Sequence, residues 1–422
     1  MKQTKICVIG LGYVGLPLAR LFSTKFQTIG FDLNQDRVDA LIQGHDATLE
    51  VSDELLQDAI NKHGFVCTTD IEKIRDCNFY VVAVPTPVDE DDFPDLRPLI
   101  GASQTVGKVI SNGDVVVYES TVYPGVTEEK CLPVVEQVSG LKFNIDFFAG
   151  YSPERINPGD KQHTVEKIKK VTSGSTPETA DYVDAVYNTV LVNGTHKAPS
   201  IKVAEASKII ENSQRDVNIA FMNELARIFN VMGIDTHDVI EAAASKWNFI
   251  KLSPGLVGGH CISVDPYYLI QKAQAYGVWP RIMMNARRLN DTMGEYVAQQ
   301  TVELMNLKGV MVKDAKILIL GITFKENCPD IRNTKVVDIY YGLHKYTNRI
   351  TVCDPLADAE AVMHEYHIPL TRDIPQQQFD VIILAVAHSY FQDIDIRQLT
   401  KNPSIVYDVK GVLPRDIIDG RL

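Results

Sequence analysis

The amino-acid sequence predicts an α/β protein with two Rossmann-like, doubly wound parallel-sheet domains joined by a helical middle region. Apolar runs of strand length alternate with helix-length segments in both the first and the last part of the 422-residue chain. A stretch over 200–232 without proline or glycine separates these two parts and favours a long helix. We therefore expect three domains, over residues 1–198, 199–309 and 310–422.

The first expected strand leads into a glycine-rich turn. An apolar run over 5–9 is followed by Gly10, Gly12 and Gly15, and then by a helix-like segment over 16–22. Glycines at this spacing allow a tight turn and close approach of the backbone to a pyrophosphate, which the free N–H groups of the helix N-terminus bind. The turn therefore predicts a dinucleotide site; a glycine turn without a nucleotide is the structural alternative.

The second expected strand decides between dinucleotides. The run over 28–31 ends on Asp32, about 20 residues after the glycines, where a carboxylate accepts hydrogen bonds from the ribose hydroxyls. An acid there repels a 2′-phosphate, so NAD is favoured over NADP. Arg37 qualifies this prediction, because a basic residue nearby could face a phosphate.

The rest of the N-terminal domain follows the same alternation. Strand-like runs recur at 79–84, 115–118 and 147–149. In a parallel sheet the loops at the carboxyl ends of the strands hold the ligands. The loops in question are 85–87, 119–121 and 151–155.

The middle and C-terminal regions differ in pattern. Beyond the long helix over 200–232, we expect further helix with Asp235 or Thr236 as its N-cap and a long helical segment from Met283 to Leu307. Strand-like runs then return at 315–320, 350–354, 381–386 and 405–408. The turn over 321–325 lacks the full glycine set, so Lys325 and neighbouring amides could hold a nucleotide diphosphate, or the domain could be purely structural.

The composition of the chain indicates which classes of partner it does not have. The net charge of −12 without a basic block argues against nucleic acid. No apolar run approaches the roughly 20 residues of a membrane span, and no signal peptide is recognisable, so we expect a cytoplasmic protein. The seven cysteines form neither a disulfide framework nor a metal pair, and no metal is expected.

One cysteine has a distinctive setting. Cys261 follows Gly258 and Gly259, which leave room for a substrate, and Asp265 comes four residues later. A thiol nucleophile together with a hydride acceptor suggests oxidation through a thioester. The alternative is a structural cysteine.

Seven motifs in this order match one known family. They are 10–15, 84–87, 119–122, 152–155, 205–208 with Asn212, the Cys261 loop, and 321–325 through Arg332. Over essentially its whole length the chain resembles the UDP-glucose/GDP-mannose dehydrogenase family, NAD-dependent enzymes that oxidise the C6 alcohol of a nucleotide sugar to a carboxylate.

Within that family the chain is most similar to the N-acetylhexosamine branch. Val264 stands where the glucose branch usually has a lysine, and the segments 246–249 and 254–261 agree with the branch. The resemblance implies a four-electron oxidation of UDP-N-acetylglucosamine or UDP-N-acetylgalactosamine in bacterial surface-polysaccharide synthesis. UDP-N-acetylmannosamine and UDP-glucose are the alternative substrates.

The resemblance also implies roles for individual residues. Cys261 is expected to be the nucleophile. Lys208 and Asn212, one helical turn apart on one face, are expected beside the reacting C6, where the lysine stabilises oxyanion character. A solvated surface lysine is the alternative.

Three further residues are expected in catalysis. Asp265 and Thr121 resemble the pair that orders the catalytic water, and Glu154 the general acid/base of thioester hydrolysis. Glu154 could instead be merely ion-paired, with Arg155 as the candidate partner.

Binding residues follow from the same motifs. The expected cofactor contacts are Gly10, Gly12, Tyr13, Val14, Gly15, Asp32, Arg37, Pro85, Thr86, Ser120, Thr121 and Arg332. The expected contacts to the nucleotide sugar are Glu154, Arg155, Lys208, Asn212, Phe249, Lys251, Pro254, Gly255, Gly258 and Lys325, with Lys246 as a basic residue reaching in from a partner subunit. The family's helical middle region implies a homodimer.

Two other classes of function stay open at this point. A two-electron hydroxyacid dehydrogenase shares the N-terminal fold and a helix lysine but needs no cysteine loop. A non-catalytic nucleotide-binding protein would bind cofactor without turnover. The number of NADH molecules released per substrate distinguishes these hypotheses.

Overall fold

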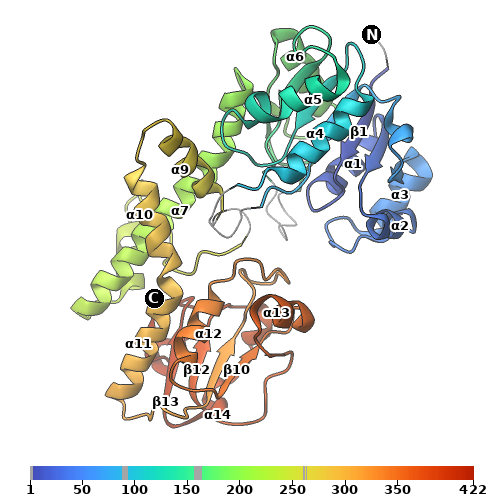
Figure 1. Cartoon of the computed structure of the whole chain (residues 1–422). Coiled ribbons are helices and arrows are strands. Elements are labelled where there is room, and N and C mark those ends of the chain that lie inside the picture. The colour runs from blue at the N-terminus through green and yellow to red at the C-terminus, as the bar shows by residue number, and fades with distance from the viewer. Residues whose placement is uncertain (1–2, 88–93, 156–163, 260–261, 263) are drawn as a thin grey trace. The chain divides into compact units, whose positions relative to one another are not determined.

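A computed structural model describes residues 3–87, 94–155, 164–259, 262 and 264–422. The chain forms two compact units, one of residues Met1–Glu211 with Tyr267–Gly277 and one of Asn212–Pro266 with Val278–Leu422. Helix α7 (Ile201–Met232) runs from the first unit into the second (Figure 1).

The first unit is built on a parallel sheet of six strands in the order β3-β2-β1-β4-β5-β6. Its strands are β1 (Lys5–Ile9), β2 (Gln27–Phe31), β3 (Val66–Thr68), β4 (Phe79–Val82), β5 (Val115–Tyr118) and β6 (Phe148–Tyr151). The central strands β4 and β5 are buried along their whole length, as expected for a parallel sheet covered on both faces. This strand order brings the ends of β1 and β4 together, where dinucleotide-binding sheets hold their ligand.

Helices and a small second sheet complete the first unit. The helices are α1 (Gly15–Ser23), α2 (Gln35–Ile42), α3 (Asp53–His63), α4 (Arg97–Val109), α5 (Leu132–Ser139), α6 (Pro177–Asn188) and α9 (Asp265–Ala275), with short turns η1 (Ile71–Ile74) and η2 (Thr127–Cys131). Strands β7 (Lys170–Thr172) and β8 (Thr195–Lys197) pair in parallel. Two apolar clusters of buried residues form the core of this unit.

The second unit contains another six-stranded parallel sheet, in the order β11-β10-β9-β12-β13-β14. Its strands are β9 (Ile317–Leu320), β10 (Ile350–Cys353), β11 (Leu370–Thr371), β12 (Phe379–Leu384), β13 (Thr400–Asp408) and β14 (Gly420–Arg421). Its helices are α8 (Thr236–Ala244), α10 (Arg281–Asp291), α11 (Met293–Leu307), α12 (Val336–His344), α13 (Ala359–Tyr366) and α14 (Ile396–Leu399), with turns η3 (Ser389–Phe391) and η4 (Arg415–Ile417). The fold class predicted from the sequence is confirmed.

The helical region differs in detail from the prediction. The expected segment from Met283 to Leu307 consists of two helices, α10 and α11, that meet at Thr292. Asp235 caps α8, accepting a hydrogen bond from the Asp238 N–H at 3.1 Å, whereas Thr236 is its first residue. Among the described residues, no helix is long and apolar enough to cross a membrane.

The two sheets repeat one local design. The N–H of Gly10 donates to the Phe31 carbonyl and that of Gly321 to the Cys353 carbonyl, each at 2.8 Å. Both glycines have positive φ, +91° and +89°, which other residues rarely adopt. The chain therefore leaves β1 and β9 through equivalent turns.

Candidate active site

The turn after β1 has the geometry of a dinucleotide-binding loop. A Cβ on Gly15 would lie 1.8 Å from the Gly10 carbonyl oxygen, so only glycine allows α1 to approach the strand this closely. Gly12, by contrast, is exposed, and a Cβ there would meet no atom within 4 Å. Open space at this glycine and a helix N-terminus directly beyond it fit a pyrophosphate.

Asp32 lies where β2 ends and faces this turn. Its carboxylate accepts hydrogen bonds from the backbone N–H groups of Leu11 (2.8 Å) and Asn34 (2.9 Å). Arg37 supports the same turn, because its Nε donates to the Leu11 carbonyl at 2.9 Å and its Nη1 lies 2.7 Å from the buried Asp46 carboxylate. The guanidinium is therefore engaged by Asp46 and the turn.

Hydrogen bonds tie together the loops at the carboxyl ends of β4 and β5. Ser120 Oγ donates to the Val84 carbonyl and Thr86 Oγ1 to the Thr121 carbonyl, both at 2.7 Å. The hydroxyl of Tyr268, in α9, donates to the Thr86 carbonyl. Three of the expected site positions, Thr86, Ser120 and Thr121, are thus held in one arrangement across two loops. Of the remaining cofactor positions on this unit, Tyr13 and Pro85 are exposed and Val14 is half-buried.

The loop after β6 contains Glu154 and Arg155. Glu154 is 7% exposed. Arg155 is ion-paired with Glu211 of α7, and its Nη1 donates to the Lys169 carbonyl at 2.7 Å. The ion pair of Arg155 is thus made with α7. Lys170 places a cation near Glu154, with its Nζ 4.0 Å from the Glu154 carboxylate.

Helix α7 buries the two polar residues expected on one of its faces. Lys208 and Asn212 are each 6% exposed, so Lys208 is not a solvated surface lysine. The side-chain amide of Asn212 donates to the Asp265 carboxylate at 2.5 Å. Asp265 is buried at the first turn of α9, where sequence reasoning expected a loop, although Asp followed by Pro266 is a helix-start signal.

The chain segment that leads to Cys261 is fastened at two points. Asn223 Nδ2 donates to the Gly255 carbonyl (3.0 Å), while the Gly255 N–H donates to Asn223 Oδ1 (2.8 Å). Further on, the Gly259 N–H donates to the Arg332 carbonyl, and Asn333 Nδ2 donates to the Gly259 carbonyl, each at 3.1 Å. His260, Cys261 and Ser263 lie outside the described residues.

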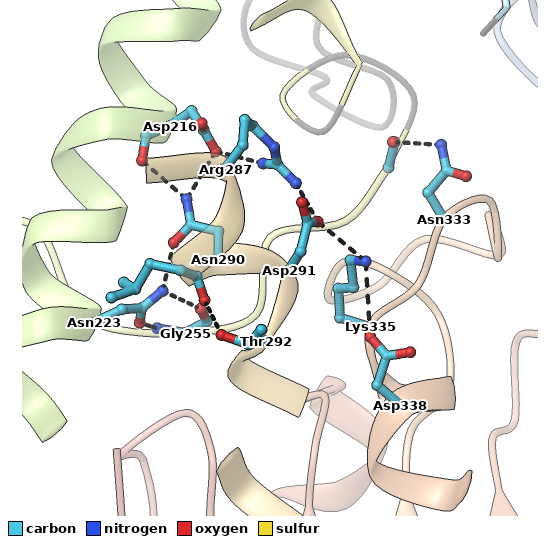
Figure 2. A network of polar contacts seen from close by, with 12 residues as sticks. Asp216, Asn223, Gly255, Arg287, Asn290, Asp291, Thr292, Asn333, Lys335 and Asp338 are labelled. Atoms are coloured by element: carbon cyan, nitrogen blue, oxygen red, sulfur yellow. Dashed lines mark hydrogen bonds and ion pairs between the residues drawn. The ribbon is translucent and has the colours of Figure 1, made fainter. Parts of the chain in front are cut away.

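Figure 2 shows the polar network behind the first fastening. Asn223 also donates to Asn290 Oδ1 at 2.8 Å, and Asn290 in turn donates to Asp216 Oδ1 at 2.8 Å. Arg287, 2% exposed, joins Asp216 to Asp291 through two contacts of 2.5 Å. This buried network connects α7 and α10 and holds the backbone at Gly255.

Glycine is required on the described side of the cysteine loop. A Cβ on Gly258 would lie 2.6 Å from the Asn333 carbonyl oxygen. Gly259 has φ +89°, and a Cβ there would lie 2.7 Å from the Phe324 ring. Gly258 and Gly259 therefore pack directly on the turn that contains Phe324 and Lys325. Lys325 itself is half-buried.

That second turn is closed by a buried histidine. Asp354, after β10, accepts hydrogen bonds from the Ile322 N–H (2.7 Å) and from His388 Nε2 (3.0 Å), and both Asp354 and His388 are fully buried. Burial disfavours the charge on Asp354, but the hydrogen bonds from His388 and Ile322 outweigh it and lower its pKa to about 2. Asp354 corresponds to Asp32 in position, but its carboxylate already accepts a hydrogen bond from His388.

The remaining predicted substrate positions are spread over the segment before the cysteine loop. Pro254 and Gly255 are buried and Phe249 is half-buried, whereas Lys246 and Lys251 are exposed. Lys251 forms an ion pair with Glu241. Arg332 is also exposed, with its Nε 3.0 Å from the Asp330 carboxylate.

The chain has two doubly wound domains joined by a long helix, and one of these domains carries a dinucleotide-binding turn. Buried lysine, amide and carboxylate groups lie on the connecting elements. Together these features define a nucleotide-dependent dehydrogenase. Family models for the NAD-binding, central and UDP-binding domains match residues 4–191, 202–292 and 318–415. The chain belongs to the UDP-glucose/GDP-mannose dehydrogenase family, as its motifs predicted, and NAD is its cofactor.

Known proteins resemble the chain from end to end. It is 56% identical over 425 residues to a UDP-N-acetyl-D-glucosamine 6-dehydrogenase of Pseudomonas aeruginosa, with 100% of both chains covered. It is 53% identical to the enzyme of the same name from Salmonella typhi, covering 100% of this chain and 99% of the other. A solved structure of UDP-D-ManNAc dehydrogenase from Pyrococcus horikoshii superposes with a TM-score of 0.89 at 26% identity, covering 99% and 98%.

Proposed function

We propose that this enzyme oxidises the C6 alcohol of UDP-N-acetyl-D-glucosamine to the carboxylate in four electrons, in the synthesis of a bacterial surface polysaccharide. The observation that carries the proposal is the 56% identity, over 100% of both chains, to a UDP-N-acetyl-D-glucosamine 6-dehydrogenase. UDP-N-acetylgalactosamine, its epimer at one hydroxyl, is the alternative substrate, followed by UDP-N-acetylmannosamine and UDP-glucose.

The residues at the first turn fit the cofactor. The open space at Gly12 and the carboxylate of Asp32 suit a pyrophosphate and an adenosine ribose. Tyr13, Val14, Pro85, Thr86, Ser120 and Arg332 complete the proposed contacts. When bound, NAD supplies the hydride acceptor for both oxidations.

The groups proposed around C6 are Lys208, Asn212 and Asp265. The ammonium of Lys208, being buried, stabilises negative charge on the sugar oxygen more strongly than a solvated lysine would. Asn212 donates to Asp265, which supports a fixed orientation of that carboxylate. Asp265 and Thr121 are proposed to hold the water used in the final step.

Cys261 is the proposed nucleophile of the second oxidation. Its sulfur attacks the C6 carbonyl carbon of the aldehyde, a C–S bond forms, and the carbonyl oxygen takes a proton to give a thiohemiacetal. Loss of a hydride from C6 and of the proton from the hydroxyl group then gives a thioester. Water then attacks the thioester carbon, Glu154 accepts a proton from the water, and the C–S bond breaks to release the carboxylate. The fastening of Gly255 and Gly259 supports a defined path for the chain toward this residue.

The UDP group is assigned to the second unit. Lys325 lies in the turn on which Gly259 packs, so a diphosphate held by Lys325 and its neighbouring amides would bind next to the cysteine loop. Glu154, Arg155, Phe249, Lys251, Pro254 and Gly258 are the other proposed substrate contacts.

A homodimer completes the proposal. Val203, Ile210, Phe221 and Ile228 are each about half exposed and are spaced 7, 11 and 7 residues apart on α7, which places them in one stripe. Exposed apolar stripes of this kind are typical of helical interfaces. Lys246 is proposed to reach the partner's substrate, and the enzyme is proposed to act in the cytoplasm.

The test measures NADH release with UDP-N-acetylglucosamine, UDP-N-acetylgalactosamine, UDP-N-acetylmannosamine, UDP-glucose and GDP-mannose. We expect the highest kcat/KM with UDP-N-acetylglucosamine and two NADH per sugar. One NADH per sugar would indicate a two-electron dehydrogenase, and cofactor binding without turnover a binding protein.

A cysteine variant tests the covalent step. Cys261→Ser removes the thiol, so we expect acid production to be lost while the Kd for NAD stays unchanged, as measured by quenched-product analysis and calorimetry. Full acid production by this variant would contradict the thioester mechanism.

A further inference from the structure

A fully buried cluster of charged residues lies behind Glu154. Lys170, the first residue of β7, donates from its Nζ to Glu119 Oε2 at 2.6 Å and to the Pro153 carbonyl at 3.2 Å. Tyr187 of α6 donates its hydroxyl to the other oxygen of Glu119 at 2.5 Å. Glu119, Lys170 and Tyr187 are each 0% exposed.

Lys170 is shared between two carboxylates. Its Nζ is 4.0 Å from Glu154 Oε2, while it is hydrogen-bonded to Glu119. Because it also holds the carbonyl of Pro153, the residue before Glu154, it fixes both the backbone and the charge environment of the proposed general acid/base. An ion pair needed only for stability would not require contact with this loop, and a buried pair is weak support for stability in any case.

Both oxygens of Glu119 accept hydrogen bonds, from Lys170 and from Tyr187, which favours the ionised carboxylate. Burial acts in the other direction and raises the pKa of Glu119, with Lys170 opposing this rise and Glu154 adding to it. Burial also raises the pKa of Tyr187, and the neighbouring Glu119 and Glu154 act in the same direction, so the phenol stays protonated. The ionisable groups that face one another here are thus Glu119 after β5, Glu154 after β6, Lys170 on β7 and Tyr187 on α6.

We propose that Lys170, held in place by Glu119 and Tyr187, is a positioning residue that orients Glu154 and places a positive charge beside its carboxylate for thioester hydrolysis. This inference rests on the proposed function, in which Glu154 accepts the proton of the attacking water. Lys170 acts through Glu154 and its loop and contacts no reacting atom.

The two members of the ion pair should act on Glu154 with opposite sign. Lys170→Met removes the positive charge 4.0 Å from the Glu154 carboxylate, so the acidic limb of the kcat against pH profile should move to higher pH by about one unit. Glu119→Gln leaves Lys170 without its counter-charge, so the same limb should move to lower pH. Lys170→Arg should keep the limb close to that of the unaltered enzyme.

The experiment uses the full-length enzyme with UDP-N-acetylglucosamine and NAD. It records acid production against pH, the covalent adduct on the quenched enzyme by mass spectrometry, and the midpoint of thermal unfolding. Lys169→Met, at an exposed neighbouring lysine, is the matched control and should change none of these. If Lys170→Met does not fold, the near-isosteric Glu119→Gln still tests the predicted shift.

The possible results distinguish a failure of the role proposed for Lys170 from a failure of the role proposed for Glu154. Shifts in opposite directions, with adduct accumulating in Lys170→Met, support the proposal. If the pH limbs are unchanged and only the unfolding midpoint falls, the proposal is wrong and the ion pair has a structural role alone. Undiminished acid production by Glu154→Gln would instead overturn the proposed role of Glu154.

Discussion

Asp32 is a residue with two tasks. Its carboxylate holds the glycine turn through Leu11 and Asn34 and is proposed to accept the adenosine ribose hydroxyls. Asp32→Ala should therefore raise the Kd for NAD at least tenfold, about 1.4 kcal/mol, measured by calorimetric titration. Asp32→Asn, which keeps an acceptor for the turn, should weaken binding less.

The control for this prediction is Asp36→Ala, which removes an exposed acid on the neighbouring helix α2. Its Kd should match that of the unaltered enzyme. An unchanged Kd in Asp32→Ala would show that the carboxylate does not meet the ribose.

Glu205 gives a pH-dependent stability at the scale of single residues. It lies on α7 and accepts the N–H groups of Gly125 (2.5 Å) and Thr127 (3.0 Å). Burial raises its pKa to about 7 despite these hydrogen bonds. Between its unfolded value of about 4.3 and 7, the folded state binds more protons than the unfolded state, so this residue's contribution to the free energy of unfolding falls as pH rises.

Glu205→Gln removes that titration. We expect urea unfolding to show that the variant gains stability relative to the unaltered enzyme as pH rises from about 4.3 to 7, the range between the unfolded and the folded pKa of Glu205. A stability difference that is constant across this range would argue against a protonated Glu205 in the folded enzyme.

At the scale of elements, the asparagine fastening of the cysteine loop is a stability determinant. Asn223→Ala removes two hydrogen bonds to Gly255 and one to Asn290, all in buried surroundings (Figure 2). Since buried groups left without partners are costly, we expect the free energy of unfolding to fall by roughly 2 to 4 kcal/mol. Urea unfolding measures this loss.

The matched control is Asn248→Ala, at an exposed asparagine. It should change the free energy of unfolding by less than about 0.5 kcal/mol. A similarly small change in Asn223→Ala would mean that water replaces the side chain without loss.

The sequence predicts correctly the elements whose signals are local, and the proposed site residues come from signals of the same kind. The fingerprint from Gly10 to Asp32, the strand runs and the helix with Lys208 each follow from patterns within about 30 residues. The cluster behind Glu154 was not found, because Glu119 and Lys170 are 51 residues apart and a lone lysine in a strand has no local signature. The fastening by Asn223 was missed for the same reason, its partner Gly255 being 32 residues away.

At the scale of the whole molecule, the stripe on α7 is the predicted contact surface of the proposed homodimer. Phe221→Glu places a charge in the middle of that apolar stripe and should convert a dimer to a monomer, as measured by light scattering after size-exclusion chromatography. Val192→Glu, at an apolar residue 74% exposed outside the stripe, should leave the mass unchanged. A dimeric Phe221→Glu enzyme would place the contact elsewhere.

The occupied acid of the second sheet has a kinetic consequence. Asp354, which corresponds to Asp32 in position, already accepts a hydrogen bond from His388. We therefore expect the C-terminal crevice to bind no second dinucleotide. In the proposed four-electron oxidation, both hydrides then leave the sugar at a single crevice, where spent nucleotide has to be exchanged halfway through each turnover. If the proposed bond to Cys261 holds the half-oxidised sugar during that exchange, the sugar cannot escape as a free aldehyde.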